Sequence, residues 1–168
     1  MKNQLLKAIA FFSIITLVAS CGKDNIGAKH QQQISLLANG VPFSVTTGDT
    51  DVEDADAHIR ADTVFQLDAE KGDKDFSINY NKIIGTGTYT INKNNYSLFN
   101  FAQWEDGDDL FTNSGGSNKS RLIFTITNIA GSASDHLRYI EGTFYGVLYN
   151  ITQTDSVIIT NGQISFID

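Results

Sequence analysis

The sequence predicts an all-β fold, either an antiparallel β-sandwich or a barrel, built from about ten short strands. From Ile34 onward, apolar and polar residues alternate in short runs, which is the period of a strand with one buried face. Glycine, asparagine and aspartate separate these runs, as expected for turns. No stretch after Ile34 has the 3.6-residue apolar period of a useful amphipathic helix.

The first two predicted strands form a hairpin. Ile34–Ala38 and Val41–Thr47 flank Asn39-Gly40, and both turn residues tolerate the positive φ angles of a two-residue turn. Pro42 has no N–H group to donate, so we expect the second strand at the edge of a sheet.

The middle of the chain alternates predicted strands with polar or acidic turns. Phe76, Ile78 and Tyr80 alternate with small polar residues, which indicates a strand with one apolar face. The predicted segments are an acidic loop at Gly48–Asp56, a strand pair at His58–Ala69 and Asp75–Ile84 around Glu70–Lys74, a short strand at Gly87–Ile91, a polar turn at Asn92–Asn95, a strand at Tyr96–Trp104, and a second acidic loop at Glu105–Asp109.

The last third holds the longest predicted strand, Arg138–Thr152. It places Ile140, Phe144 and Leu148 on one face and Tyr139, Tyr145 and Tyr149 on the other. Gly142 and Gly146 fall on the apolar face, which indicates a bend or close packing. The other predicted segments are a strand at Arg121–Ile129, preceded by a long connection through Gly115-Gly116, and a second hairpin of Ser156–Thr160 and Gln163–Ile167 around Asn161-Gly162.

The start of the chain is typical of an export signal. Lys2 and Lys7 precede the apolar run Ala8–Ala19, which is too short to cross a bilayer but suits a signal peptide. Leu17-Val18-Ala19-Ser20-Cys21 resembles a bacterial lipobox. The resemblance implies cleavage before Cys21, a diacylglycerol thioether on its sulfur, and a further acyl chain such as palmitate on the new amino terminus. Two or more chains anchor a protein stably.

We therefore expect a signal peptide at residues 1–20, a lipidated cysteine and flexible tether at residues 21–33, and a single β-domain at residues 34–168. Gly22 stands where an aspartate would favour the inner membrane, and Lys23-Asp24 is similar to the charged start of surface lipoproteins in Bacteroidota-type bacteria. The expected location is the outer membrane, with the periplasmic and the surface-facing orientation both open.

Charge and cysteine content exclude several classes. The chain has 12 basic and 19 acidic residues and a formal charge of −7; removal of the two signal-peptide lysines makes this −9. Such a charge repels phosphate backbones and anionic headgroups, so we expect no nucleic-acid partner and membrane attachment through the lipid alone. Cys21 is the only cysteine, and once it is modified no thiol remains for a disulfide, a nucleophile or a zinc site.

The β-domain also resembles a family of small Bacteroidota-type outer-membrane lipoproteins of unknown function. The motifs are Asn-Gly-x-Pro-Phe at 39–43, Gly-Thr-Tyr at 87–89, Gly-Thr-Phe at 142–144 and Ile-Thr-Asn-Gly-Gln-Ile-Ser-Phe at 159–166. The resemblance covers most of residues 34–168. It implies the envelope location and the all-β domain again, and it carries over no activity.

The first acidic loop is a weak candidate for calcium, with ligands Asp49, Asp51, Glu53, Asp54 and Asp56, since calcium takes six to eight oxygens. An EF-type loop starting at Asp49 would need glycine at position 54 and glutamate at position 60, where the chain has Asp54 and Arg60. A solvated acidic loop is the favoured interpretation, and no metal or cofactor is expected.

Catalytic constellations are poorly supported. The histidines are His30, His58 and His136. Ser134, Asp135 and His136 are adjacent, so on an extended segment their side chains would diverge, whereas a triad needs groups converging from separate positions.

The aromatic residues are the remaining binding candidate. Tyr139, Tyr145 and Tyr149 share a predicted strand face, and Trp104 lies on another strand. An exposed strip of such rings could stack on sugars or bind a protein, although filling of a sandwich or barrel interior is the favoured interpretation. Thr63 and Ser156, in Asp-Thr-Val and Asp-Ser-Val, resemble O-glycosylation acceptors of Bacteroidota-type envelopes.

The expected function is thus non-enzymatic: a lipid-anchored envelope domain that binds an unidentified protein or glycan or has a structural role. Two alternatives stay open. One is an envelope enzyme such as a glycoside hydrolase, which would need two carboxylates across a cleft. The other is a lipocalin-like barrel with an apolar ligand.

Overall fold

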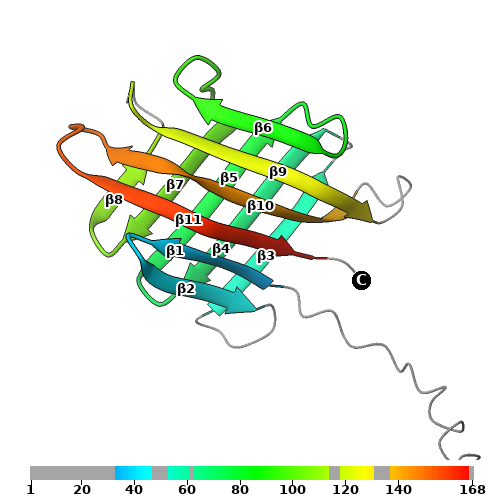
Figure 1. Ribbon diagram of the computed structural model, residues 1–168, viewed down its shortest axis with the longest axis horizontal. Helices are drawn as coiled ribbons and strands as arrows, with labels where there is room; N and C mark the ends of the chain where they lie inside the picture. The colour runs from blue at the N-terminus through cyan, green and yellow to red at the C-terminus, as the bar shows by residue number, and fades with distance from the viewer. Residues whose placement is uncertain (1–32, 47–52, 61–62, 114–117, 131–136, 167–168) are drawn as a thin grey trace, which may run out of the picture.

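The computed structural model describes residues 33–46, 53–60, 63–113, 118–130 and 137–166, and throughout these ranges it is built of antiparallel strands without a helix (Figure 1). The predicted fold class is therefore confirmed. The strands are β1 Gln33–Ala38, β2 Val41–Thr46, β3 Glu53–Arg60, β4 Val64–Lys71, β5 Lys74–Asn81, β6 Gly87–Asn92, β7 Asn100–Asp106, β8 Asp109–Thr112, β9 Arg121–Ala130, β10 Leu137–Asn150 and β11 Ser156–Ser165. β1 begins at the last residue of the predicted tether.

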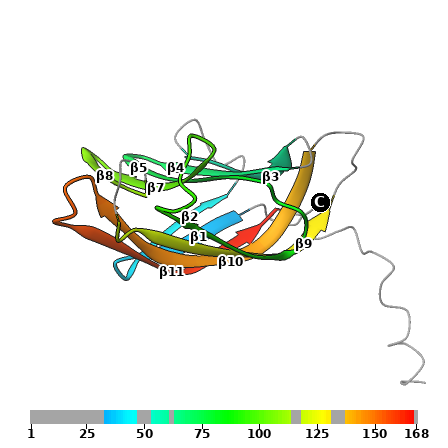
Figure 2. The ribbon, with the colours of Figure 1, turned by 90° about the horizontal axis from the view of Figure 1, so that it is seen from above.

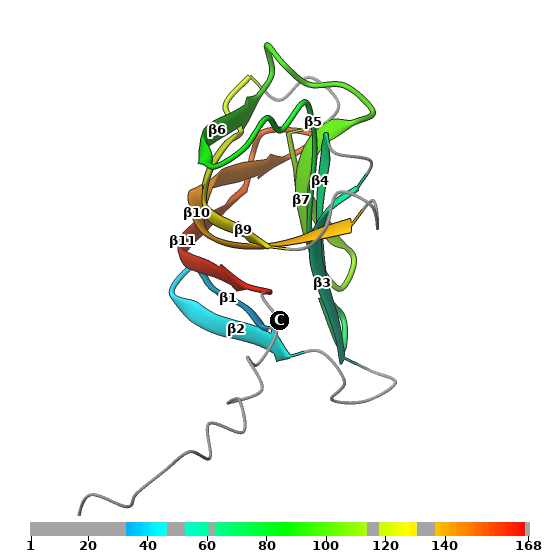
Figure 3. The ribbon, with the colours of Figure 1, turned by 90° about the vertical axis from the view of Figure 1, so that its right-hand side faces the viewer.

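The strands form two layers packed face to face. One layer runs β3-β4-β5-β7-β8, and the other runs β2-β1-β11-β10-β9-β6. Figures 2 and 3 show the layers edge on. In Figure 1 the strands of one layer cross those of the other at a steep angle, as in orthogonal β-packing.

β10 joins the two layers. Its first residues pair with β3 through Arg138↔Ile59 and Tyr139↔His58, and its last residues pair with β8 through Tyr149↔Thr112. Between these ends it pairs with β11 on one side and with β9 on the other. The hydrogen-bonded path from β3 through β4, β5, β7 and β8 thus returns to β10, so the sandwich is also closed in the manner of a small barrel.

Aromatic pairs fill the space between the layers. Phe65 of β4 stacks on Phe124 of β9 with ring centroids 5.0 Å apart, and Phe76 of β5 stacks on Phe144 of β10 at 4.9 Å. These four rings are buried, and each aromatic pair contributes about 0.5–1.5 kcal/mol beyond its area of burial. This packing favours a solid sandwich over a barrel that carries a ligand at its centre.

The glycines of β10 allow a close approach of β9, as their position predicts. A Cβ on Gly146 would overlap the carbonyl oxygen of Arg121 and lie 2.8 Å from Cα of Leu122. A Cβ on Gly142 would overlap the carbonyl oxygen of Thr125. The β9 backbone therefore occupies the space that side chains would need.

The first hairpin is confirmed. Asn39 and Gly40 have φ angles of 51° and 82°, and Ala38 pairs with Val41 across them. β2 is at the end of the strand order, so Pro42 lies on an edge strand as predicted.

The predicted strand His58–Ala69 is wrong, because the chain turns within it and forms two paired strands, β3 and β4. Ala57, Ile59, Phe65 and Leu67 are all buried. The apolar alternation keeps the same phase on both sides of the turn, so periodicity alone could not show the break.

The predicted second hairpin is also wrong. β11 runs through Asn161-Gly162 without turning, and its register shifts there against both β1 and β10. Asn161 has a φ of 52°, so the dipeptide forms a β-bulge. The physical reason is that a bulge and a hairpin turn use the same left-handed backbone conformation.

The two acidic loops are corrected as well. Glu53–Asp56 belong to β3 rather than to a loop, and Glu105–Asp109 form the β7–β8 hairpin around Gly107, whose φ is 61°. β8 was not predicted. The strand predicted to start at Tyr96 starts at Asn100, whose Nδ2 donates to the carbonyl oxygen of Asn95 at 3.0 Å and holds a loop before β7.

We expect Gly146→Ala to lower the free energy of unfolding by about 1–3 kcal/mol, since its Cβ would force β9 and β10 apart. Urea unfolding followed by circular dichroism measures the change. Thr143→Ala, exposed on the same strand, is the control and should stay within about 0.5 kcal/mol of the parent. An alanine at position 146 that leaves stability unchanged would show that the close approach does not constrain the fold.

Candidate functional site

A cleft of about 380 Å³ opens where several turns meet. The β1–β2, β7–β8 and β10–β11 turns lie at the left of Figure 1. The β1–β2 hairpin forms one wall, and the β7–β8 hairpin together with the start of β5 forms the other. The β10–β11 turn contributes Asp155. The volume falls within the range of small-molecule sites.

The floor of the cleft is apolar and aromatic. Phe43, Trp104 and Phe111 line it, and the rings of Phe43 and Trp104 meet edge to face with centroids 5.1 Å apart. Trp104 is only 3% exposed. Ala38 and Val157, both buried, complete the floor. Such a surface favours an apolar part of a ligand.

The rim is charged. Asp106, Asp109, Asp155 and Lys74 line it. Lys74 Nζ forms an ion pair with Asp106, so the rim as a whole carries an excess of two negative charges. The wall formed by the β1–β2 hairpin is fixed to β11, because Asn39 Oδ1 accepts a hydrogen bond from the Ile158 N–H at 2.8 Å. A ligand with an apolar body and a cationic group would complement this arrangement.

The structure does not bring the predicted aromatic strip together. Trp104 lies in the cleft floor on β7, whereas Tyr139, Tyr145 and Tyr149 lie on β10. Tyr139 packs partly against the core, and Tyr149 lies under Lys119 Nζ, 5.4 Å from the ring centroid. Tyr145 is 54% exposed and is the open ring of the set.

Of the candidate calcium ligands, only Asp56 has a side chain that the structure describes. Asp49 and Asp51 lie outside the described residues, and of Glu53 and Asp54 only the position on β3 is described. Asp56 is on β3 and pairs with His58 rather than with another carboxylate. In the described ranges no group of three or more histidine, cysteine, aspartate or glutamate side chains is arranged to hold a metal ion.

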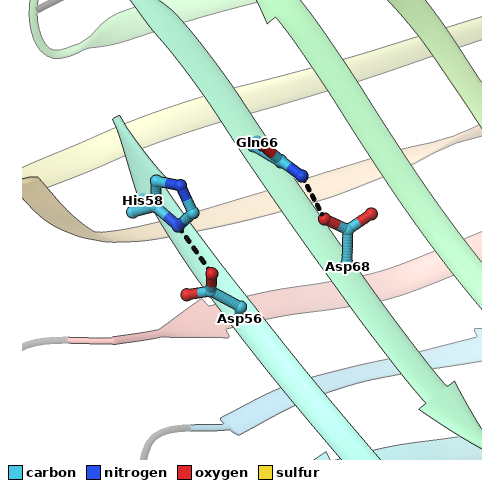
Figure 4. A network of polar contacts seen from close by, with 4 residues as sticks. All are labelled: Asp56, His58, Gln66 and Asp68. Carbon is cyan, nitrogen blue, oxygen red and sulfur yellow. Dashed lines mark hydrogen bonds and ion pairs between the residues drawn. The ribbon is translucent and has the colours of Figure 1, made fainter. Parts of the chain in front are cut away.

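A polar network covers the outer face of β3 and β4 (Figure 4). His58 Nδ1 lies 2.7 Å from Asp56 Oδ2, and Gln66 Nε2 donates to Asp68 Oδ2 at 2.8 Å. The strands place Asp56 opposite Asp68 and His58 opposite Gln66. His58 is buried, and its Nε2 has no hydrogen-bond partner within the described structure. Sequence reasoning assigned Asp56 to a loop and missed this pairing.

Two carboxyl groups on the strands of this layer, Asp68 of β4 and Asp75 of β5, have raised pKa values. Burial raises the pKa of Asp68, and the negative charge of Asp56 adds to the rise, against the hydrogen bond from Gln66. Burial also raises the pKa of Asp75, and Glu105 and Glu70, which pair directly with it, raise it further against a hydrogen bond from Ser77. Neither Asp68 nor Asp75 lines the cleft. Asp68 and Asp75 are therefore not arranged as a catalytic pair across the cleft; they belong to an acidic surface of the sheet.

The remaining predicted residues are the candidate glycosylation and lipidation sites and the other histidines. Thr63 is exposed in the turn before β4, and Ser156 is partly buried at the start of β11. Cys21, with the predicted signal peptide and almost all of the predicted tether, lies outside the described residues, as do His30, Ser134, Asp135 and His136.

Comparison of the chain with protein-family models, with curated proteins and with solved structures found no match. Within the ranges that the structure describes, no helix has the length and apolar character needed to cross a membrane.

Asp68→Asn should raise the free energy of unfolding at pH 7. Burial holds the pKa of Asp68 in the folded protein above its ordinary value of 3.8, so the charged form is penalised in the folded state. The amide removes this penalty and can still accept a hydrogen bond from Gln66. The gain should vanish below about pH 3.8, where the carboxyl is neutral in both states. Urea unfolding at pH 7 and at pH 3 measures it.

Asp108→Asn, exposed in the β7–β8 turn, is the control for removal of one negative charge from an acidic chain. A D68N variant that gains no more stability than D108N at pH 7 would contradict the assignment of a buried, penalised charge to Asp68.

Proposed function

We propose that this protein is a lipid-anchored, non-enzymatic binding domain of the bacterial outer membrane, whose ligand occupies the cleft between the β1–β2 and β7–β8 hairpins. The cleft carries the proposal because an enclosed aromatic floor and a charged rim meet there. Concave, largely apolar hollows with a few placed polar groups are the usual form of a ligand site. The lipobox residues ending at Cys21 support the anchor.

The ligand class follows from the lining. Phe43, Trp104 and Phe111 supply ring surfaces for an apolar or aromatic body. Because Lys74 is already paired with Asp106, Asp109 and Asp155 carry the excess negative charge and favour a cation at the mouth. An amine or a lysine- or arginine-bearing segment with an adjacent apolar group meets both requirements.

Neither alternative function gains comparable support from these residues. The acidic residues of the cleft all lie on its exposed rim, whereas the general acid of a glycosidase is a carboxyl group held in an apolar environment. A lipocalin-like carrier would hold its ligand between the layers, where the stacked phenylalanines lie.

Phenethylamine should quench or shift the fluorescence of Trp104, while 3-phenylpropionate, of opposite charge, should do so much more weakly. Trp104 is the only tryptophan of the chain, so its emission reports the cleft directly. Full-length protein in detergent micelles is titrated with each compound. Equal responses to the two probes, or no response to the amine, would overturn the proposed ligand class.

Asp109→Asn should weaken phenethylamine binding about two- to fivefold, since an exposed charge pair contributes about 0.2–1 kcal/mol. Asp108→Asn is the matched control: it removes an exposed charge one residue away that does not line the cleft, and it should leave the affinity unchanged. Equal losses in D108N and D109N would point to the overall charge of the chain instead of the rim.

Cys21→Ser should release the protein from membranes and abolish its partition into a detergent phase, because no sulfur remains for the thioether. Ser20→Ala keeps a small residue before the cysteine and should stay anchored. Phase partition, together with the mass of the N-terminal peptide, measures both. A C21S variant that still enters the detergent phase would refute lipid anchoring at this residue.

A further inference from the structure

A second hollow lies on the outer face of the layer that holds β10 and β11. It is a shallow groove of about 460 Å³ and shares no residue with the cleft. Its lining consists of Thr143, Phe144, Tyr145, Thr160, Asn161, Gly162 and Gln163.

The β-bulge of β11 shapes this groove. Phe144 pairs with Gly162 and Gly146 pairs with Ile159, so Thr160 and Asn161 together oppose the single residue Tyr145. Thr160 and Asn161 are both exposed, whereas Ile159 and Gly162 on either side are buried. The bulge therefore turns two consecutive polar side chains outward beside the same aromatic ring, and bulges commonly re-aim side chains at functional sites.

The floor of the groove is rigid and depends on glycine. A Cβ on Gly162 would overlap the ring of Phe144. That ring is itself buried and stacked on Phe76, so it cannot move away easily. Tyr145 pairs with Ile123 of β9 on its other side. The groove thus opens between Tyr145 and the bulge.

The lining complements a neutral, hydroxyl-rich ligand. Tyr145 offers an exposed ring, and Thr143, Thr160, Asn161 and Gln163 offer exposed hydroxyl and amide groups that both donate and accept. None of the seven lining residues is charged, although the chain as a whole is strongly acidic. A sugar ring presents a C–H face that stacks on an aromatic ring and equatorial hydroxyls that bind amides.

We propose that the Tyr145 groove is a binding site for a neutral carbohydrate, with one sugar ring stacked on Tyr145 and its hydroxyls bound by Asn161 and Gln163. The proposal does not depend on the ligand of the cleft. Tyr145 is held on a strand and keeps its place without a ligand, so little ordering is needed on binding.

The test is calorimetric titration of the full-length protein, kept in a detergent without a sugar headgroup, with cellohexaose, mannohexaose and maltohexaose. At least one hexasaccharide should bind, and Trp104 fluorescence should stay constant because Trp104 is buried in the other hollow. Hexagalacturonate, which is anionic, should not bind. Failure of all three neutral sugars overturns the proposal, and so does binding that changes Trp104 emission as phenethylamine does.

Variants of the groove sharpen the result. Tyr145→Ala should weaken binding at least about tenfold through loss of the stacked ring, while Tyr145→Phe should retain most of it. Asn161→Gly keeps the left-handed backbone and removes the amide, so it should weaken binding without unfolding the strand. Tyr96→Ala, an exposed tyrosine outside the groove, is the control. Sugar binding that survives Y145A, in a variant with a parental unfolding midpoint, would refute the site.

Discussion

The structure depends on one strand, β10, which hydrogen-bonds with β11, β9, β3 and β8. A strand can pair with strands of both layers only if it bends. The middle of β10 pairs within one layer, and its two ends pair with β3 and β8 of the other layer. Gly142 and Gly146 make this geometry accessible, because the β9 backbone lies where their side chains would be. Between the two glycines, Phe144 points into the core and stacks on Phe76 of the opposite layer. The same short segment thus joins the layers by hydrogen bonds and by ring contacts.

Both hollows lie next to β10 or the turn that follows it. β11 must pair with the bent β10 on one side and with β1, the inner strand of the first hairpin, on the other. Its register shifts against both at Asn161-Gly162, and the extra residue that absorbs the mismatch also shapes the groove beside Tyr145. At the other site, the turns of both layers meet around the floor formed by Phe43, Trp104 and Phe111. Both hollows therefore lie where regular strand pairing ends or shifts in register.

Much of the fold could be predicted from local patterns, and the hairpin predicted at Asn161-Gly162 shows why part of it could not. Asn39-Gly40 and Asn161-Gly162 are the same dipeptide with almost the same asparagine φ, 51° and 52°, yet one turns and the other bulges. The difference is that β11 pairs with β1 on one side and with β10 on the other. These pairings are not local to Asn161-Gly162 in the sequence. Alternation predicted that Phe144 and Tyr145 lie on opposite faces of one strand, but the favoured interpretation, that the tyrosines fill the interior, does not hold for Tyr145, which is 54% exposed. The cleft could not be predicted, because Asp109 and Trp104 lie on one hairpin while Asn39 and Asp155 come from distant turns.

The two proposed sites differ in charge, because acidic side chains line the rim of the cleft whereas no charged residue lines the Tyr145 groove. A third surface, on the other layer, concentrates acidic residues. On the outer face of β3–β5 and β7, Asp56 opposes Asp68, and Asp75 opposes both Glu70 and Glu105. Like charges directly opposite destabilise a sheet. The pKa values of Asp68 and Asp75 are raised first by burial and further by these neighbouring charges, so the charged form of each carries a penalty in the folded state. Acidification through the range in which these groups titrate relieves it, so their contribution to stability increases as the pH falls. The cleft rim carries the negative charge that attracts a cation, so binding there should weaken as salt screens it. The Tyr145 groove has no charged lining, so sugar binding there should weaken little with salt.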